Sequence, residues 1–234
     1  MLGDVVSLGY RTNRWRKVDL FLYSCKKENI AVFGLLGNHD VMGRKNKGER
    51  NFNKRFPENI RTGYISITDS VAVILLNSNF SKLSAAEKRK QLNWYKLMLK
   101  TLDKNFAVKA IIVTCHHAPY TNSIIVGSSN VVQQSFVPPF MDASKAQLFI
   151  TGHAHAFEHF NIKGKHFLVI GGGGGLHQPL NNSTKSILDL AADYKPFFHY
   201  LSIQLLTNQF QITSHYLKED FSAILNGYNF VINF

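Results

Sequence analysis

The sequence has little cysteine, few acidic residues and no long apolar run. Two cysteines, Cys25 and Cys115, cannot form the disulfide network that holds small secreted domains together. No stretch of about 18 apolar residues occurs, so no transmembrane helix is expected. The first residues also lack the basic flank and the apolar core of a signal peptide. Since 45% of the 234 residues are apolar, intrinsic disorder is excluded as well.

The shortage of acidic residues leaves a strongly positive balance. The chain has 27 Lys and Arg residues against 15 Asp and Glu residues, a formal net charge of +12. A basic surface favours anionic partners, and phosphorylated small molecules, nucleic acid and acidic membrane surfaces all fit it. A solvated basic surface without any partner is the alternative. The net charge therefore indicates anionic partners as a class and does not distinguish among them.

The order of apolar and polar segments predicts an α/β protein with a large sheet. No repeat and no Pro-rich or Ser-rich linker divides the chain, so a single domain over residues 1–234 is expected. Ser84 and Glu87 form a capping box that marks a helix start. The spacing predicts helices over residues 12–28 and 84–102, a loop over 44–55, an apolar run over 30–36, and strands over 64–68, 71–76, 110–114, 147–151, 167–170, 200–206 and 210–216.

Polar clusters begin where the apolar segments end. One such cluster follows residue 36, another residue 114 and a third residue 151. Side chains that follow neighbouring strands meet at the carboxyl edge of an open α/β sheet, so these clusters are expected to converge. Imidazole and oxygen donors together suit Zn, Mn, Fe or Ni ions. The candidate site residues are Asp4, Asn38, His39, Asp40, His116, His153 and His155.

The order of these clusters resembles the calcineurin-like metallophosphoesterases. The signature of that family includes Gly-Asp, then Gly-Asn-His-Asp or Glu, then a lone His after a strand, then Gly-His-x-His. The segments 116–120 and 153–158 make the purple-acid-phosphatase-like branch the most similar one. The matching motifs are Gly3-Asp4, Gly37-Asn38-His39-Asp40, His116 and Gly152-His153-Ala154-His155.

The resemblance implies a role for each matching residue. Asp4 would bridge two metal ions, and Asn38, His116 and His153 would complete the ligands of one ion. His155 would bind the other ion. His39 would lie over the leaving group as general acid, held in place by Asp40. His117, next to His116, would contact substrate or simply pack.

The resemblance also implies a fold and a reaction. The fold would be a four-layer α/β/β/α sandwich with two mixed sheets. Two divalent or trivalent ions, drawn from Mn, Fe, Zn or Ni, would supply a metal-bound hydroxide. The protein would then be a metallophosphoesterase, a hydrolase that cleaves phosphomonoesters or phosphodiesters without a covalent enzyme intermediate.

The chain departs from the family pattern in two places. It contains no Asp-x-His, the first motif of the family, whose two residues bind the ion that His155 also binds and end the first central strand. We therefore expect an N-terminally truncated domain without that strand. The purple subgroup has an iron-binding tyrosine three residues after the bridging Asp, and Ser7 stands there in this chain. A tyrosinate-bound ferric site is therefore not expected.

Two alternative functions stay open. The truncated chain could be a catalytically impaired phosphate-binding or interaction module, or it could be a nuclease of the same family, which the basic charge favours. The basic segment 44–55 would either steer phosphate or be solvated. The glycines at 171–175 would form a phosphate cradle or a tight connection, and the absence of a following Lys-Ser/Thr excludes a P-loop. Glu158 would support the ligands or lie on the surface.

Overall fold

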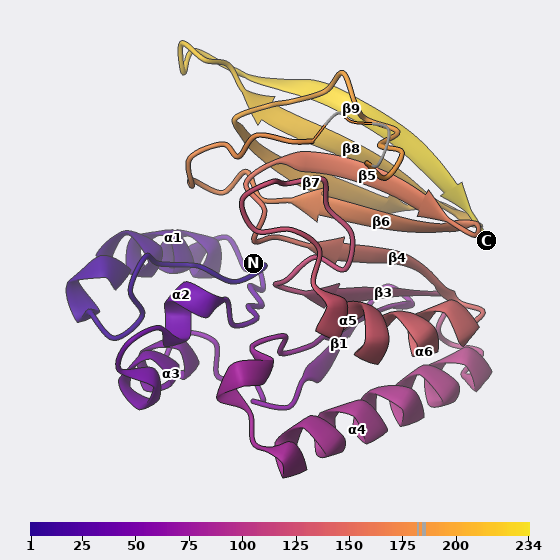
Figure 1. Ribbon diagram of the computed structural model, residues 1–234, viewed down its shortest axis with the longest axis horizontal. Helices are drawn as coiled ribbons and strands as arrows, with labels where there is room; N and C mark the ends of the chain where they lie inside the picture. The colour runs from indigo at the N-terminus through magenta and orange to yellow at the C-terminus, as the bar shows by residue number, and fades with distance from the viewer. Residues whose placement is uncertain (182, 184–185) are drawn as a thin grey trace.

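A computed structural model describes residues 1–181, 183 and 186–234 of the chain. Six strands form a mixed sheet and three form a second sheet, packed face to face (Figure 1). The elements in chain order are η1 (Thr12–Trp15), α1 (Arg16–Lys27), α2 (Asn38–Val41), α3 (Lys45–Asn53), β1 (Tyr64–Thr68), β2 (Val71–Leu75), η2 (Phe80–Lys82), α4 (Ala85–Lys104), β3 (Ala110–Cys115), α5 (Asn130–Ser135), α6 (Val137–Asp142), β4 (Ala146–Thr151), β5 (Phe157–Ile162), β6 (Lys165–Ile170), β7 (Phe198–Leu205), β8 (Gln209–Leu217) and β9 (Ile224–Asn233).

The large sheet has the order β1-β2-β3-β4-β6-β5. Its four central strands are parallel, and the two edge strands β1 and β5 are antiparallel to their neighbours. All six residues of β3 are buried, as expected for a strand covered on both faces. The predicted α/β class with two sheets is confirmed. The second sheet, predicted to be mixed, is antiparallel in the described residues, because hairpin connections join neighbouring strands in that direction.

Two apolar layers hold the sandwich together. Helices α4, α5 and α6 cover one face of the large sheet (Figure 1), where Tyr95, Leu99 and Phe140 are buried against β2, β3 and β4. The second sheet covers the other face, and Phe210 and Ile212 of β8 pack there on Ile112 and Leu148. The carboxyl ends of β3 and β4 are thereby left at one end of the sandwich.

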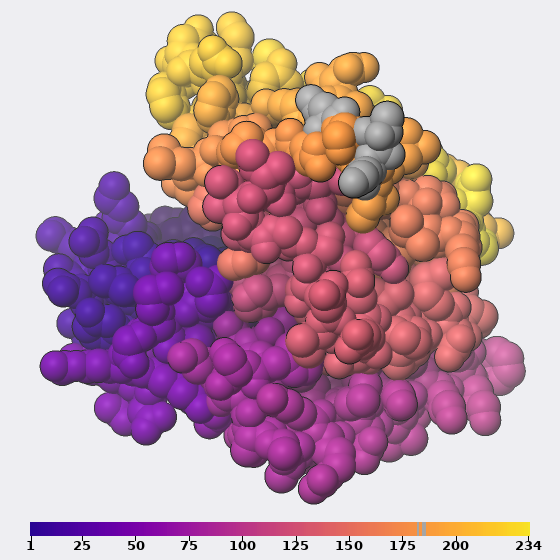
Figure 2. Space-filling model, viewed as in Figure 1, coloured from indigo at the N-terminus to yellow at the C-terminus, as the bar shows by residue number. Residues whose placement is uncertain are grey.

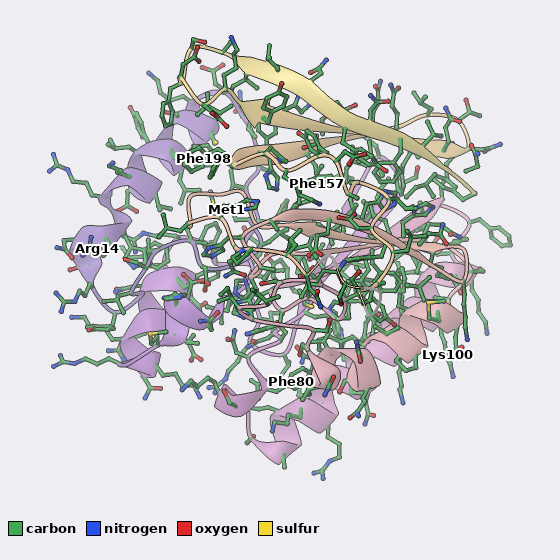
Figure 3. All side chains as sticks on the ribbon, turned by 45° about the horizontal axis from the view of Figure 1, so that its top comes forward. Met1, Arg14, Phe80, Lys100, Phe157 and Phe198 are labelled. Atoms are coloured by element: carbon green, nitrogen blue, oxygen red, sulfur yellow. The ribbon has the colours of Figure 1, made fainter. Side chains whose placement is uncertain are left out.

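The N-terminal residues form a separate cluster at that end. Trp15, Phe52 and Phe56 are fully buried together and join α1 to α3. Figure 2 shows the N-terminal part of the chain, in indigo and purple, at one side of the molecule and below the yellow C-terminal segment. Met1 lies between the N-terminal helices and the sheets (Figure 3), and its amino group donates a hydrogen bond to the carbonyl of Phe33 (2.7 Å).

Most predicted elements are confirmed, and one is wrong. Helix α4 begins after Ser84, whose hydroxyl accepts a hydrogen bond from the backbone of Glu87 while the Glu87 carboxylate accepts one from Ser84 N. The segment predicted as a loop over residues 44–55 contains helix α3 instead. None of the helices in the described part of the chain combines the length and the apolar character needed to cross a bilayer.

Candidate metal centre

The segment Gly3-Asp4 and the segment that begins at Gly37 contact each other at the candidate metal site. Gly3 and Asp4 both have a left-handed backbone, with φ of 83° and 51°. A Cβ atom on Gly37 would lie 2.1 Å from the nitrogen of Asp4, and one on Gly3 would lie 2.5 Å from the nitrogen of Gly37. Glycine at both positions therefore allows the two segments to touch. As a result, Oδ1 of Asp4 accepts a hydrogen bond from the backbone N–H of His39 (2.7 Å).

The histidines come from the ends of two adjacent strands. His116 directly follows β3, and His153 and His155 follow β4, which runs parallel to β3. The backbone N–H of Gly152 donates to the carbonyl of His116 (3.1 Å), which continues the pairing past the strand ends. His153 adopts a left-handed backbone with φ of 64°, a strained conformation of the kind that collects at functional sites.

Four donor atoms converge at one point. Nε2 of His116 lies 3.0 Å from Oδ1 of Asn38, 3.1 Å from Nδ1 of His153 and 3.2 Å from Oδ2 of Asp4. The structure therefore brings together Asp4, Asn38, His116 and His153 from the two glycine motifs and the two strand ends.

The other ring nitrogen of His116 decides what this cluster can bind. Nδ1 lies 2.7 Å from the carbonyl oxygen of Leu2, which can only accept, so Nδ1 carries the proton. In the neutral ring Nε2 then presents a lone pair to the carboxylate of Asp4 and the amide oxygen of Asn38. Converging lone pairs repel one another unless a cation lies between them. The donor set thus fits a borderline divalent metal ion, with a backbone carbonyl orienting the imidazole as in known metal sites.

His117 adjoins the cluster from the side. Ligand nitrogens of His116, His117 and His153 all lie within 4.8 Å of one another. Nδ1 of His117 is 2.8 Å from the hydroxyl of Ser78, which also accepts from the His117 N–H (3.0 Å). Burial, and then the charge of His116 when that ring is protonated, lower the pKa of His117 to about 3 and that of His153 to about 4. Both imidazoles are therefore neutral near pH 7, the form that binds metals.

Asp4 remains ionised although it is mostly enclosed. Burial by itself raises the pKa of this carboxyl group. When His116 is protonated, its hydrogen bond and its charge, together with the N–H of His39, outweigh burial and lower the pKa on balance. Asp4 can therefore supply a negative charge to a cation at neutral pH.

The carboxylate of Asp40 and the ring of His39 hydrogen-bond to other partners and not to each other, contrary to the expectation from the resemblance. Its buried carboxylate accepts hydrogen bonds from the backbone N–H groups of Gly37 (2.9 Å) and Val6 (3.4 Å). The ring of His39 donates from Nδ1 to the carbonyl of Ser7 instead (3.0 Å). Burial, aided by the charge of Asp4, raises the pKa of Asp40 to about 7. One reason is local: Asp40 is the third residue of α2, so its carboxylate turns back to the N–H of Gly37 at the helix start. The other is tertiary: the N-terminal segment brings the N–H of Val6 to the same carboxylate.

His155 lies apart from the four-atom cluster. Its Nδ1 donates to the carbonyl of Leu176 (2.8 Å), in the segment that follows the glycine run. Glu158 is fully buried, so its interpretation as a surface residue is wrong. Its carboxylate accepts hydrogen bonds from the hydroxyl of Thr121 and from the N–H of Asn122 (2.7 Å), in the loop that follows the histidine pair.

Comparison with known proteins settles the family. Residues 1–157 match the family model described as calcineurin-like phosphoesterase. The chain belongs to this family. Membership supports its classification as a hydrolase of phosphoric ester bonds and implies divalent metal ions, with which the histidine cluster is compatible.

Solved structures of similar fold include two phosphatases and GAP50. A purple acid phosphatase from yellow lupin (Lupinus luteus) seeds has a TM-score of 0.73 at 12% identity, over 99% of this chain. GAP50, described as the anchor in the inner membrane complex of Plasmodium, has a TM-score of 0.65 at 18% identity, over 99% of this chain and 87% of its own. A dimetal phosphatase from Danio rerio has a TM-score of 0.57 at 13% identity, over 99% of this chain and 82% of its own.

The extent of these matches differs. This chain spans 45% of the length of the lupin phosphatase. No curated protein sequence matches the chain. At such low identity the structural likeness shows the fold, and the chemistry of the site has to be argued from the residues themselves.

Several groups that support the site have no signature in the sequence. Three imidazoles are oriented by the backbone carbonyls of Leu2, Ser7 and Leu176. A carbonyl is present at every position, so no residue pattern identifies these partners. Ser78 follows β2 by three residues, and its position beside β3 is the only signal that could have indicated it.

Proposed function

We propose that this chain is a metal-dependent phosphoesterase with its metal held by Asp4, Asn38, His116 and His153. The observation that carries the proposal is the convergence of three potential ligand atoms within 3.2 Å of His116 Nε2. Membership of the calcineurin-like phosphoesterase family supports it independently. Two bound ions would activate water as the nucleophile and polarise the phosphate of a monoester or diester.

His39 is proposed as the general acid toward the leaving group. Its Nδ1 is held by the carbonyl of Ser7, which leaves Nε2 to face the substrate. A protonated Nε2 could give its proton to the departing alkoxide. Asp40, bonded to Gly37 and Val6, fixes the turn that carries His39, and thus acts as a positioning residue.

Three residues are assigned to the second metal ion and to the substrate. His155 would bind the second ion, and Asp4, with two carboxylate oxygens, would bridge both. His117 would contact a phosphate oxygen, since its ring lies beside His116 and its Nδ1 is held by Ser78.

The test is hydrolysis of p-nitrophenyl phosphate and of bis(p-nitrophenyl) phosphate with Mn, Fe, Zn or Ni added. Asn38→Ala and His116→Ala are expected to lower kcat/KM by more than about 100-fold, since even outer-shell partners cost 10–100-fold. His215→Ala, on the second sheet and bonded to Ser202, is the control and should retain activity. Equal activity in all three variants would contradict the proposal.

Metal content separates the enzyme from an impaired binding module. About two ions per chain supports the dinuclear enzyme, and a chain that binds none is a non-catalytic module. Among the described residues only His155 is assigned to the second ion alone. Loss of metal from His155→Ala, measured as one ion fewer per chain, would therefore support its role.

One surface feature of the structure adds to the basic net charge in favour of the nuclease alternative. A cleft of about 520 Å³ is lined by basic side chains, namely Arg44, Lys45, Lys47 and Arg50, together with Asn46. Phosphate contacts from such residues make nucleic-acid binding fall steeply with salt. An affinity for single-stranded DNA that does not change between low and high salt would exclude this function.

A further inference from the structure

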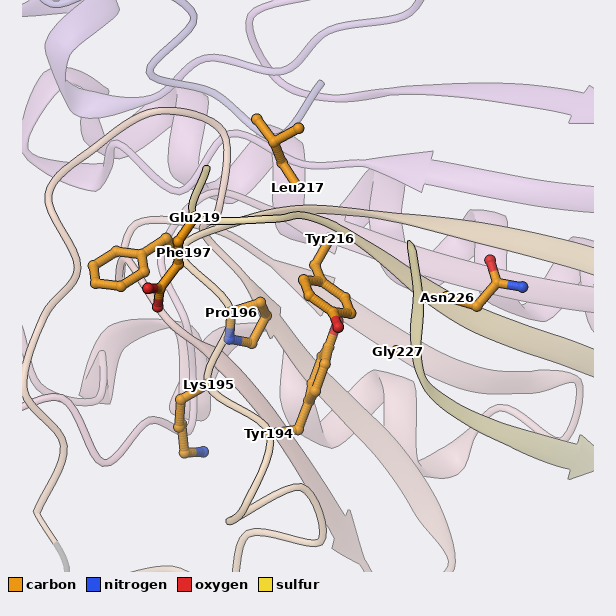
Figure 4. Close-up of a pocket in the computed structure, with 9 residues that line it drawn as sticks. All are labelled: Tyr194, Lys195, Pro196, Phe197, Tyr216, Leu217, Glu219, Asn226 and Gly227. Atoms are coloured by element: carbon orange, nitrogen blue, oxygen red, sulfur yellow. The ribbon is translucent and has the colours of Figure 1, made fainter. Parts of the chain in front are cut away.

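A pocket of about 330 Å³ lies between the residues before β7 and the β8–β9 hairpin (Figure 4). Three aromatic residues line it. Figure 4 shows Phe197 on one side, Tyr194 and Tyr216 on the other, and Pro196 between them. Its volume lies at the lower end of the range of small-molecule sites. The pocket contains none of the residues assigned to the metal centre.

The aromatic walls are held in place. The ring of Tyr194 packs edge-on against Phe157 at 5.0 Å and against Tyr216 at 6.0 Å. Its hydroxyl pairs with the hydroxyl of Ser214 (3.0 Å). A Cβ atom on Gly227 would lie 2.2 Å from that hydroxyl, so glycine leaves the ring its space. The pocket is therefore organised before any ligand enters.

The charges around the pocket disfavour a phosphate inside it. The ammonium group of Lys195 is already bound to the carboxylate of Asp189 (2.7 Å) and to the carbonyl of Ala191 (3.1 Å). The exposed carboxylate of Glu219 lies at the rim and would repel an anion while accepting hydrogen bonds. Ring walls with an acceptor at the rim suit a neutral aromatic group that carries N–H or O–H donors.

The pocket is close to His155, one of the residues assigned to the candidate metal centre. Phe197, which is 53% exposed, has its ring 5.5 Å from the ring of His177. The residues just before His177 pack on His155: Leu176 accepts its hydrogen bond at 2.8 Å, and a Cβ on Gly175 would lie 2.2 Å from the His155 ring. The segment 175–177 thus lies between the aromatic pocket and His155, which is proposed to bind metal.

We propose that this pocket binds the aromatic ring of the substrate's leaving group, and that the substrate class is nucleoside phosphates. The assignment rests on the proposed function, because the phosphate would lie at the metal centre. A sugar is the kind of spacer that would let a base reach over the segment at His177. Contacts with the rings of Phe197 and Tyr216, on opposite sides of the pocket, would hold the base, and Glu219 would accept a hydrogen bond from an exocyclic amine.

The first test uses the metal-free protein, so that it does not depend on hydrolysis. Adenosine is titrated into the wild type and into two variants, Tyr216→Ala and Phe197→Ala, with binding followed by NMR. Both variants are expected to weaken binding tenfold or more. Tyr200→Ala is the matched control, since Tyr200 is 52% exposed on β7 and stacks on His215. Phe197 is also half exposed, so its removal should leave the fold intact.

The second test compares two substrates on the metal-loaded protein. For adenosine 5′-monophosphate, Phe197→Ala and Tyr216→Ala should lower kcat/KM tenfold or more, while kcat/KM for glycerol 2-phosphate stays unchanged. No adenosine binding by the wild type, or equal binding by all variants, overturns the pocket assignment. If no ester is hydrolysed by the wild type, the proposed function fails, and adenosine binding alone then decides whether the pocket recognises nucleosides.

Discussion

His116 joins the parts of the site because its two ring nitrogens face different segments. Nδ1 is tied to the carbonyl of Leu2, and Nε2 faces Asp4, Asn38 and His153. A side chain in this position transmits the placement of the N-terminal segment to the ends of β3 and β4. The arrangement of the candidate metal ligands therefore depends on the hydrogen bond between His116 and the carbonyl of Leu2.

Single residues also set the response of the protein to pH. Burial lowers the pKa of His199 to about 4, and its ring packs edge-on against Phe157 at 5.4 Å. The unfolded chain binds a proton at this residue near pH 6.5, and the folded chain does not until about pH 4. The contribution of His199 to stability is therefore complete above pH 6.5 and is lost as the pH falls toward 4.

His199→Leu should accordingly flatten the pH dependence of stability. We expect the drop in the free energy of unfolding between pH 7 and pH 5 to be smaller in the variant than in the wild type. Urea denaturation at both pH values, followed by circular dichroism, measures the difference. An identical drop in both proteins would show that His199 is not the group responsible.

At the scale of elements, helix α3 illustrates how tertiary contacts override local composition. The segment 44–55 is polar, basic and contains Gly48, which is typical of a loop. In the fold, Phe52 is fully buried with Trp15 and Phe56, and Arg55 pairs with Asp19 of α1 (2.6 Å). One apolar anchor and its partners, distant in sequence, therefore stabilise a helix that the local pattern does not indicate.

Removing that anchor should unfold the helix locally. Phe52→Ala is expected to cost about 3–5 kcal/mol of stability, the usual range for a buried phenylalanine. Asn53→Ala, one residue on and exposed, is the matched control and should change stability by less than about 0.5 kcal/mol. Thermal unfolding of the wild type and of both variants measures these changes in stability. A loss below about 1 kcal/mol for Phe52→Ala would mean that α3 is held by other contacts.

Strand β9 shows the same limit of local patterns. It contains Gly227 and several asparagines, residues that are rare in strands, and it does not alternate cleanly between apolar and polar positions. Pairing with β8 compensates for this low strand propensity: Phe210 lies opposite Ile232, and Ile212 lies opposite Phe230. Strand β5, with the sequence FEHFNI, was not predicted either. The remaining strands were predictable because their apolar or β-branched segments end in turn residues, glycines or polar clusters.

For the molecule as a whole, the layer between the two sheets decides whether the chain acts as one unit. We propose that residues 1–234 form a single domain, since β8 packs on β3 and β4 through Phe210 and Ile212. Sequence motifs could indicate which residues gather at the carboxyl edge. They could not indicate that the carboxylate of Asp40 also accepts a hydrogen bond from the N–H of Val6, because that contact depends on where the N-terminal segment meets α2 in space.

A single domain should unfold in one step. Tryptophan fluorescence reports on the N-terminal cluster through Trp15 and on α4 through Trp94, and far-ultraviolet circular dichroism reports on the helices and sheets. The two transitions are expected to coincide. Phe210→Ala, at a fully buried position, should lower stability by about 3–5 kcal/mol and shift both transitions together. Two separated transitions in the wild type would contradict the single-domain proposal.

The carbonyl groups that orient the imidazoles have a consequence for how this protein can change. Leu2, Ser7 and Leu176 hold His116, His39 and His155 through their main chains, not their side chains. Substitutions at these three positions leave the oxygen atoms in place as long as the backbone keeps its path. The exposed residues Ser7 and Leu176 are thus free to vary among descendants of this sequence, whereas the side chain of Leu2 also packs on the apolar core. Insertions or deletions beside these positions would turn the imidazoles away and are expected to be tolerated least.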